Sequence, residues 1–210
     1  MRILIIGAAG MVGRKLADRL ARDGRLGLHE ISHLDMVDVV LPVAPAGAGF
    51  PVATETADIS SPLAARAMVA HRPDVIFHLA AIVSGEAEQN FDKGYAINLD
   101  GTRHLLEAIR HVGHGYRPRM VFTSSIAVFG APFPDAIGDE FLSAPLTSYG
   151  TQKAIAELLL NDYTRKGFVD GVGIRLPTIC VRPGKPNLEP PAFSPTSSAS
   201  RWPGTRRCCR

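Results

Sequence analysis

The sequence predicts an α/β fold with a doubly wound, Rossmann-type parallel sheet. Short apolar runs typical of strands buried on both faces alternate with helical patterns along most of the chain. The first apolar run passes directly into a glycine-rich turn, and a helical pattern follows at once. Polar residues of recognisable chemistry follow several strands, where an open parallel sheet has its ligand crevice.

Composition indicates a globular protein. The chain has 210 residues, of which 46% are hydrophobic and 20% charged, enough for one domain with a sizeable core. No uncharged apolar run approaches the ~20 residues of a membrane helix, and the N-terminus lacks a signal-peptide pattern. We therefore expect a cytoplasmic protein without a membrane partner. The three cysteines, at positions 180, 208 and 209, form neither a disulfide framework nor a metal-ligand spacing, so no metal is expected.

The net charge of +3 depends on the end of the chain. Of the 23 Lys/Arg and 20 Asp/Glu residues, five and one lie in residues 185–210, which leaves 18 against 19, a net charge of −1, for residues 1–184. A nucleic-acid partner is therefore not expected.

The first strand and the turn after it form the expected nucleotide-binding element. Residues 2–6 are an apolar run, and a helical pattern continues up to Asp23 after the turn. Gly7 allows a tight turn, Gly10 lets the backbone approach a pyrophosphate, and Gly13 lets the helix pack closely. The alternative is a mere tight turn, but the strand–turn–helix context favours a dinucleotide site.

Residues 33–39 read as the second strand and contain two acids, Asp35 and Asp38. An acid at the carboxyl end of this strand accepts hydrogen bonds from the adenosine ribose and repels a 2′-phosphate, which favours NAD over NADP. Asp38 lies nearer the end and is the predicted residue, with a merely solvated acid as the alternative. Arg14 could instead stabilise a phosphate, which weakens the preference for NAD.

The third strand, predicted at residues 52–57, is followed by Asp58 and Ile59. Asp58 stands where an adenine amino group could be bound, and it could equally cap a helix. Ser60-Ser61-Pro62 is a helix-start signal, and we expect the helix at residues 63–71.

The fourth strand is predicted at residues 74–79. Its His78 reads as a core or strand-end histidine rather than a metal ligand, because no second histidine is suitably spaced. Ala80 and Ala81 follow, and their small size suits close approach of a cofactor. Asn98, in a long helical pattern at residues 90–113, is expected to hydrogen-bond either the backbone or the cofactor.

The fifth strand, at residues 120–123, ends in Ser124 and Ser125. The next helix carries Tyr149 and Lys153 four residues apart, so the two share one face and the ammonium can favour the phenolate. That pair is a candidate acid/base group, although surface helices carry such pairs by chance. A sixth strand at residues 171–176 leads into Pro177.

In this order, the motifs resemble the extended short-chain dehydrogenase/reductase family over residues 1–187. Within the family, residues 81–86 and 175–187 resemble dehydrogenases of four-carbon sugar acids. The resemblance implies NAD-linked oxidation of a secondary hydroxyl to a ketone, with a 2-keto acid as product. It implies that Tyr149 takes the hydroxyl proton, that Lys153 holds the nicotinamide ribose and lowers the pKa of Tyr149, and that Ser125 hydrogen-bonds the reacting oxygen.

The resemblance also assigns the remaining contacts. Expected cofactor contacts come from the glycine turn, the strand ends and the catalytic helix: Gly7, Gly10, Met11, Val12, Gly13, Asp38, Asp58, Ile59, Leu79, Ala80, Ala81, Asn98, Ser124, Tyr149, Lys153 and Pro177. Ser84 and Arg182 are expected to meet the substrate carboxylate beside Ser125 and Tyr149, although Arg182 could equally form a salt bridge. A homodimer through the long helices fits the family.

Two other functions remain open. A nucleotide-sugar epimerase or dehydratase uses the same Ser, Tyr and Lys. A non-catalytic NAD-binding remnant would follow from truncation, because residues 188–210, rich in proline, serine and arginine, show no periodicity and none of the family's substrate-binding region. We expect this tail to be a product of a frameshift or of an error in the gene model.

Overall fold

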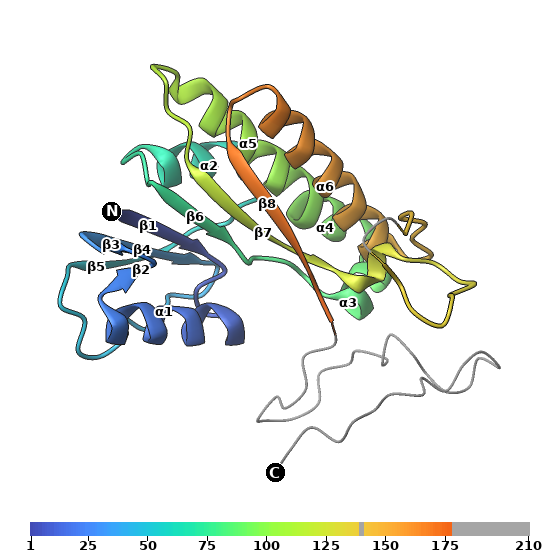
Figure 1. The fold of residues 1–210 in the computed structure, drawn as a ribbon, viewed down its shortest axis with the longest axis horizontal. Helices are drawn as coiled ribbons and strands as arrows, with labels where there is room; N and C mark the ends of the chain where they lie inside the picture. Colours follow the sequence, from blue (N-terminus) through green and yellow to red (C-terminus); the bar gives the residue numbers. More distant parts are fainter. Residues whose placement is uncertain (139–140, 178–210) are drawn as a thin grey trace, which may run out of the picture.

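Six parallel strands form the central sheet of the computed structural model, which describes residues 1–138 and 141–177 (Figure 1). Their order is β5-β4-β1-β6-β7-β8, and each pairing between neighbours is parallel. The strands are β1 (Arg2–Ile6), β4 (His33–Asp38), β5 (Val52–Thr56), β6 (Val75–His78), β7 (Arg119–Ser125) and β8 (Asp170–Leu176). The chain builds outward from β1 to β5 and then returns to continue from β6 on the other side, so a topological switch point lies between β1 and β6. The predicted doubly wound sheet is confirmed.

Helices cover both faces of this sheet. Helix α1 (Met11–Asp23) lies on one face, and α2 (Pro62–Val69), α5 (Gly101–Val112) and α6 (Ser148–Arg165) lie on the other (Figure 1). The shorter elements are the hairpin β2 (Arg25–Leu26) and β3 (His29–Glu30), the helices α3 (Ser84–Gln89) and α4 (Phe91–Gly94), the π-helical turn η1 (Tyr95–Asp100) and the 3₁₀ turn η2 (Ile126–Val128).

The alternation of side chains along the strands divides the interior into two cores. Ile3 and Ile5 pack with residues of α1, whereas Leu4 and Ile6 pack with residues of α2, α5 and α6. All four side chains are at most 2% exposed, and each contributes about 1.5–3 kcal/mol by burial. This two-sided burial is the reason that residues 2–6 read as a continuous apolar run.

Three local features differ from the predicted elements. The β2–β3 hairpin and helix α3 lie in segments for which the sequence predicted no element. The pattern predicted at residues 90–113 is helical from Phe91 to Val112, but its middle turn is a π-helix whose only buried residue is Asn98. Strand β7 begins at Arg119, one residue before the predicted start, and includes Ser124 and Ser125.

Arg182 and the irregular tail predicted at residues 188–210 lie outside the described residues.

Among the described residues, no helix combines the length and the apolar character that crossing a membrane requires.

Candidate cofactor and catalytic site

The carboxyl ends of β1, β4, β6 and β7 meet at one edge of the sheet. The register pairs Ile6 with both Val37 and His78, and His78 with Phe122. The segments that follow these strands are therefore neighbours in space. They contain most of the predicted site residues.

The glycine turn after β1 is packed so closely that side chains are excluded. Gly7 has φ +89°, and a Cβ there would lie 2.5 Å from the backbone nitrogen of Ala80. A Cβ on Gly13 would lie 2.3 Å from the carbonyl oxygen of Gly7. Gly10 is exposed, and a Cβ there would meet only Gly7 O among the described atoms within 4 Å, at 3.3 Å. Gly10 is thus the point of the turn that an outside group can approach.

Helix α1 begins at this turn, with Gly10 as its N-cap residue. No side chain of the described residues caps this helix end. Its first turn, which includes the half-exposed Met11 and Val12, therefore has N–H groups available for an anion. The turn and the helix end together form a cradle suited to a pyrophosphate.

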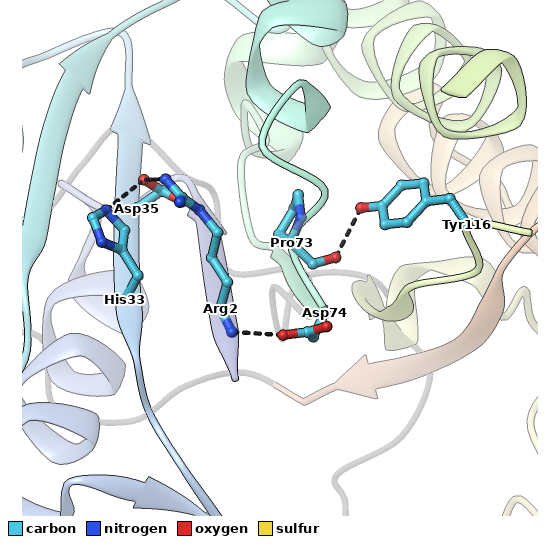
Figure 2. Close-up of polar contacts among 6 residues, drawn as sticks. All are labelled: Arg2, His33, Asp35, Pro73, Asp74 and Tyr116. Atoms are coloured by element: carbon cyan, nitrogen blue, oxygen red, sulfur yellow. Dashed lines mark hydrogen bonds and ion pairs between the residues drawn. The ribbon is translucent and has the colours of Figure 1, made fainter. Parts of the chain in front are cut away.

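The structure separates the two acids of β4. The carboxylate of Asp38 accepts hydrogen bonds from the backbone nitrogens of Ala9 and Val39, at 2.9 and 2.7 Å, so it lies against the glycine turn. The carboxylate of Asp35 instead pairs with Arg2, at 2.7 and 2.9 Å, and with His33, at 3.3 Å (Figure 2). Only Asp38 of the two lies beside the cradle.

Asp58 and Ile59 have different surroundings. Asp58 is exposed and accepts a hydrogen bond from the backbone nitrogen of Ser60 at 2.9 Å. Ser61, rather than Asp58, is the N-cap of α2, because its hydroxyl accepts from Ala64 N at 3.4 Å. The side chain of Ile59 is buried against Gly101, so a cofactor contact from Ile59 would have to use its backbone.

The loop after β6 is held from two sides. Leu79 N donates to Ile6 O at 2.8 Å, and Ala80 touches the glycine turn. Ile82 exchanges two hydrogen bonds with the buried Asn98 amide, both of 3.0 Å. Asn98 Nδ2 also donates to Gln152 Oε1 at 2.7 Å, so both amide hydrogens of Asn98 are used within the protein. Of the two partners predicted for Asn98, the structure shows the backbone.

The two serines at the end of β7 lie on opposite faces of the strand. Ser124 is 2% exposed, and its hydroxyl has no partner among the described residues. Ser125 is half-buried, and its Oγ accepts from Ala127 N at 3.1 Å, which caps η2. Because Oγ accepts this bond, the hydroxyl hydrogen of Ser125 stays available for a ligand.

Tyr149 and Lys153 lie on the first turns of α6. Lys153 Nζ is 5.8 Å from the centroid of the Tyr149 ring and 4.6 Å from that of Phe122, and it donates to Thr123 O at 2.8 Å. Lys153 is 1% exposed, and burial lowers its pKa to about 7, although the carboxylate of Glu157 acts in the opposite direction. A cation next to a phenol favours the phenolate, so the arrangement suits a tyrosine that exchanges protons.

His78 belongs to the interior of the protein. Its Nε2 lies 3.0 Å from Thr102 Oγ1, which itself donates to Asn98 O at 2.8 Å. The hydroxyl has one hydrogen, so we assign the Nε2–H tautomer to His78. Burial, and secondarily the charge of Lys153, lowers the pKa of His78 to about 3, which keeps the ring neutral. Among the described residues no group of three His, Cys, Asp or Glu side chains is arranged to hold a metal ion.

Two further predicted site residues, Ser84 and Pro177, lie at the surface or partly exposed. Ser84 is half-buried at the start of α3, and Pro177 is exposed just after β8. Sequence reasoning missed Gln152 and Glu88, both of which contact α6 or belong to it. Gln152 could have been found in the same way as Asn98, as a polar residue on the buried face of a helix. The exposed Glu88, which accepts from Ser148 N at 2.5 Å, carries no such signal.

The chain is similar in sequence and in structure to known proteins. The model of the NAD dependent epimerase/dehydratase family matches residues 3–196. A D-erythronate dehydrogenase from Cupriavidus necator is 47% identical over 198 residues, which are 92% of this chain and 60% of that protein. The crystal structure of a nucleoside-diphosphate-sugar epimerase from Agrobacterium tumefaciens superposes with a TM-score of 0.87 at 65% identity, over 90% of this chain and 56% of the other.

A UDP-glucose 4-epimerase from Brucella ovis, solved in complex with NAD, superposes with a TM-score of 0.68 at 27% identity, over 83% of this chain and 51% of the other. This chain covers only part of each relative; it spans 60% of the length of the D-erythronate dehydrogenase from Cupriavidus necator.

Proposed function

The chain belongs to the NAD dependent epimerase/dehydratase family, and from that premise we propose that it oxidises a secondary hydroxyl of a small sugar acid to a ketone with NAD. One observation carries the proposal: Lys153 and Tyr149 stand on one helix face beside the end of β7, where Ser125 retains a hydroxyl hydrogen for a ligand. The likeness to D-erythronate dehydrogenase supports a sugar acid as the substrate class, with a 2-keto acid as the product.

The residues of the cradle fit NAD. Side chains are excluded at Gly7 and Gly13, and Gly10 is open to an approaching phosphate. Asp38 beside the turn would accept the adenosine ribose hydroxyls and repel a 2′-phosphate, and the exposed Asp58 would meet the adenine. NAD, when bound, would supply the hydride acceptor.

The catalytic roles follow from the chemistry of each side chain. Tyr149 takes the proton of the substrate hydroxyl as a general base. Lys153, when protonated, stabilises the phenolate that this requires and holds the nicotinamide ribose. Ser125 donates its hydroxyl hydrogen to the reacting oxygen, where negative charge develops. Ser84 and Arg182 remain the proposed contacts of the substrate carboxylate.

A second function shares this machinery. The 65% identity to a protein named nucleoside-diphosphate-sugar epimerase favours it, because epimerases of the family use the same Ser, Tyr and Lys. The two functions differ in the fate of the reduced cofactor. A dehydrogenase releases NADH at every turnover, whereas an epimerase returns the hydride to its substrate.

The experiment that tests the proposal is a substrate screen on the purified chain with NAD. Four- and five-carbon aldonic acids and UDP-sugars are supplied separately, and NADH absorbance and sugar products are both followed. NADH accumulation with an aldonic acid supports the dehydrogenase, and epimerised sugar without free NADH supports the epimerase. Calorimetric binding of NAD without turnover of any substrate would indicate a binding-only remnant.

The proposal includes a homodimer through α5 and α6, as the family resemblance suggests. Analytical ultracentrifugation of the chain at several concentrations tests it. A monomer at every concentration would contradict this part of the proposal and leave the chemistry unaffected.

A further inference from the structure

The segment between β6 and α4 is attached to helix α6 at two points, one on each side of Tyr149. The first attachment is the buried amide bridge, which runs from Ile82 through Asn98 to Gln152. The second is the carboxylate of Glu88, which accepts a hydrogen bond from the backbone nitrogen of Ser148 at 2.5 Å. Residues 82–88 therefore cannot move away from the start of α6 without breaking hydrogen bonds.

Burying the Gln152 side chain costs free energy if its only role is to fill space. It is fully buried, and its Nε2 has no hydrogen-bond partner among the described residues. A buried polar group in that state costs about 1–3 kcal/mol, which an apolar side chain of equal volume would avoid. The chain also keeps Gly94 opposite Gln152, where a Cβ would lie 2.7 Å from Nε2. Gly94 therefore leaves room for the Gln152 amide, and that amide accepts the hydrogen bond from Asn98.

The attached segment and the attached helix carry different parts of the proposed site. Ser84, the proposed contact of the substrate carboxylate, lies between the two anchors on the segment. Tyr149 lies between the two anchors on the helix, and Lys153 directly follows Gln152. The anchors therefore determine the separation between the substrate contact and the acid/base pair, and a small error in that separation is expensive in catalysis.

We propose that Gln152, acting through Asn98, and Glu88 are positioning residues that hold residues 82–88 at a fixed separation from Tyr149 and Lys153. This inference rests on the proposed function. Neither residue is assigned a contact with the substrate or the cofactor. Their role is to align the nicotinamide side of the site, whereas the adenosine side depends on the glycine turn and Asp38.

The test uses the variant Gln152→Met, which keeps volume and helix propensity but removes the acceptor for Asn98. Gln89→Met, at the exposed end of α3, is the matched control. We expect the Ile82 amide of Gln152→Met to exchange with solvent about fivefold faster, as suits the loss of one hydrogen bond. We expect its NADH affinity to fall about fivefold while its affinity for ADP-ribose, which lacks the nicotinamide, stays unchanged.

The outcomes separate this inference from the proposed function. Equal losses of NADH and ADP-ribose affinity would overturn the positioning role, because they indicate a general effect on the fold. Unchanged NADH affinity and unchanged Ile82 exchange would overturn it as well. If the unmodified chain binds neither ligand, the proposed function fails, and the Ile82 exchange rate alone decides the positioning role.

Should Gln152→Met not fold, Glu88→Ala tests the second anchor from the exposed side. It is expected to accelerate exchange of the Ser148 amide and to weaken NADH but not ADP-ribose. Identical exchange and identical affinities in this variant would refute the inference.

Discussion

The two edges of the sheet differ in whether their polar groups have hydrogen-bond partners. At the amino edge, polar groups pair with one another: Arg2 with Asp35, the backbone nitrogen of Arg2 with Asp74 at 2.7 Å, and the hydroxyl of Tyr116 with Pro73 O at 2.8 Å (Figure 2). Burial raises the pKa of Tyr116, so its phenol remains a donor.

At the carboxyl edge, several polar groups are buried at a cost. Ser124 Oγ, His78 Nδ1 and Gln152 Nε2 have no partner among the described residues, and Lys153 is buried. The amino edge can therefore be interpreted as the stabilising end and the carboxyl edge as the functional end. Native proteins place such local violations at functional sites.

The largest expected effect is at the carboxyl edge. Tyr149→Phe should reduce turnover by about 10²–10⁴-fold, because the general base is lost, while urea unfolding changes little. The measurement is NADH formation with the best substrate of the screen. Full activity of this variant would refute the mechanism and remove the main reason for distinguishing the two edges.

Lys153 should give the carboxyl edge a distinctive pH dependence. Its pKa is about 7 in the folded protein and near the ordinary 10.5 in the unfolded chain, so between these values the unfolded chain binds the extra proton. Stability relative to Lys153→Met should therefore rise by about 2 kcal/mol from about pH 7 to about pH 9. Urea unfolding of both proteins across this range measures the difference. Parallel stability curves would show that Lys153 is not desolvated as described.

The two acids of β4 offer the most direct comparison of the edges. Asp35→Ala should cost about 1–3 kcal/mol of unfolding free energy, because it leaves Arg2 without its charged partner, and should not affect cofactor choice. Asp38→Ala should reduce the preference for NAD over NADP and should cost less stability than Asp35→Ala. Chemical denaturation and calorimetry with both cofactors test the pair. If Asp35→Ala changed the cofactor preference and Asp38→Ala cost more stability, the interpretation of the amino edge as stabilising and the carboxyl edge as functional would be wrong.

The smallest expected effect is at Tyr116. Tyr116→Phe removes the hydrogen bond to Pro73 O and should lower the unfolding free energy by about 1 kcal/mol. NADH affinity should not change, because Tyr116 lies at the amino edge. A loss of NADH affinity in this variant would mean that the edges are coupled.

Several features follow from short stretches of sequence alone. The apolar run at residues 2–6 predicted a strand buried on both faces, and the structure packs alternate residues into the two cores. Spacing predicted that Gly7 allows a tight turn and that Gly13 lets the helix pack closely; Gly7 has φ +89°, and a Cβ at either position would collide with backbone atoms. Tyr149 and Lys153 share a helix face because a helix repeats every 3.6 residues. Each of these depends on neighbours within a few positions, so local pattern was sufficient.

Other features required the tertiary structure. Nothing in the strand pattern of β4 pairs Asp35 with Arg2, 33 residues away. The bridge from Asn98 to Gln152 spans 54 residues, and the contact of Glu88 with Ser148 spans 60. Such contacts depend on the packing of elements against one another, which hydrophobic periodicity does not encode. The sequence by itself determined the fold class and the residues proposed for hydride transfer, and only the tertiary structure decided which long-range contacts hold them in place.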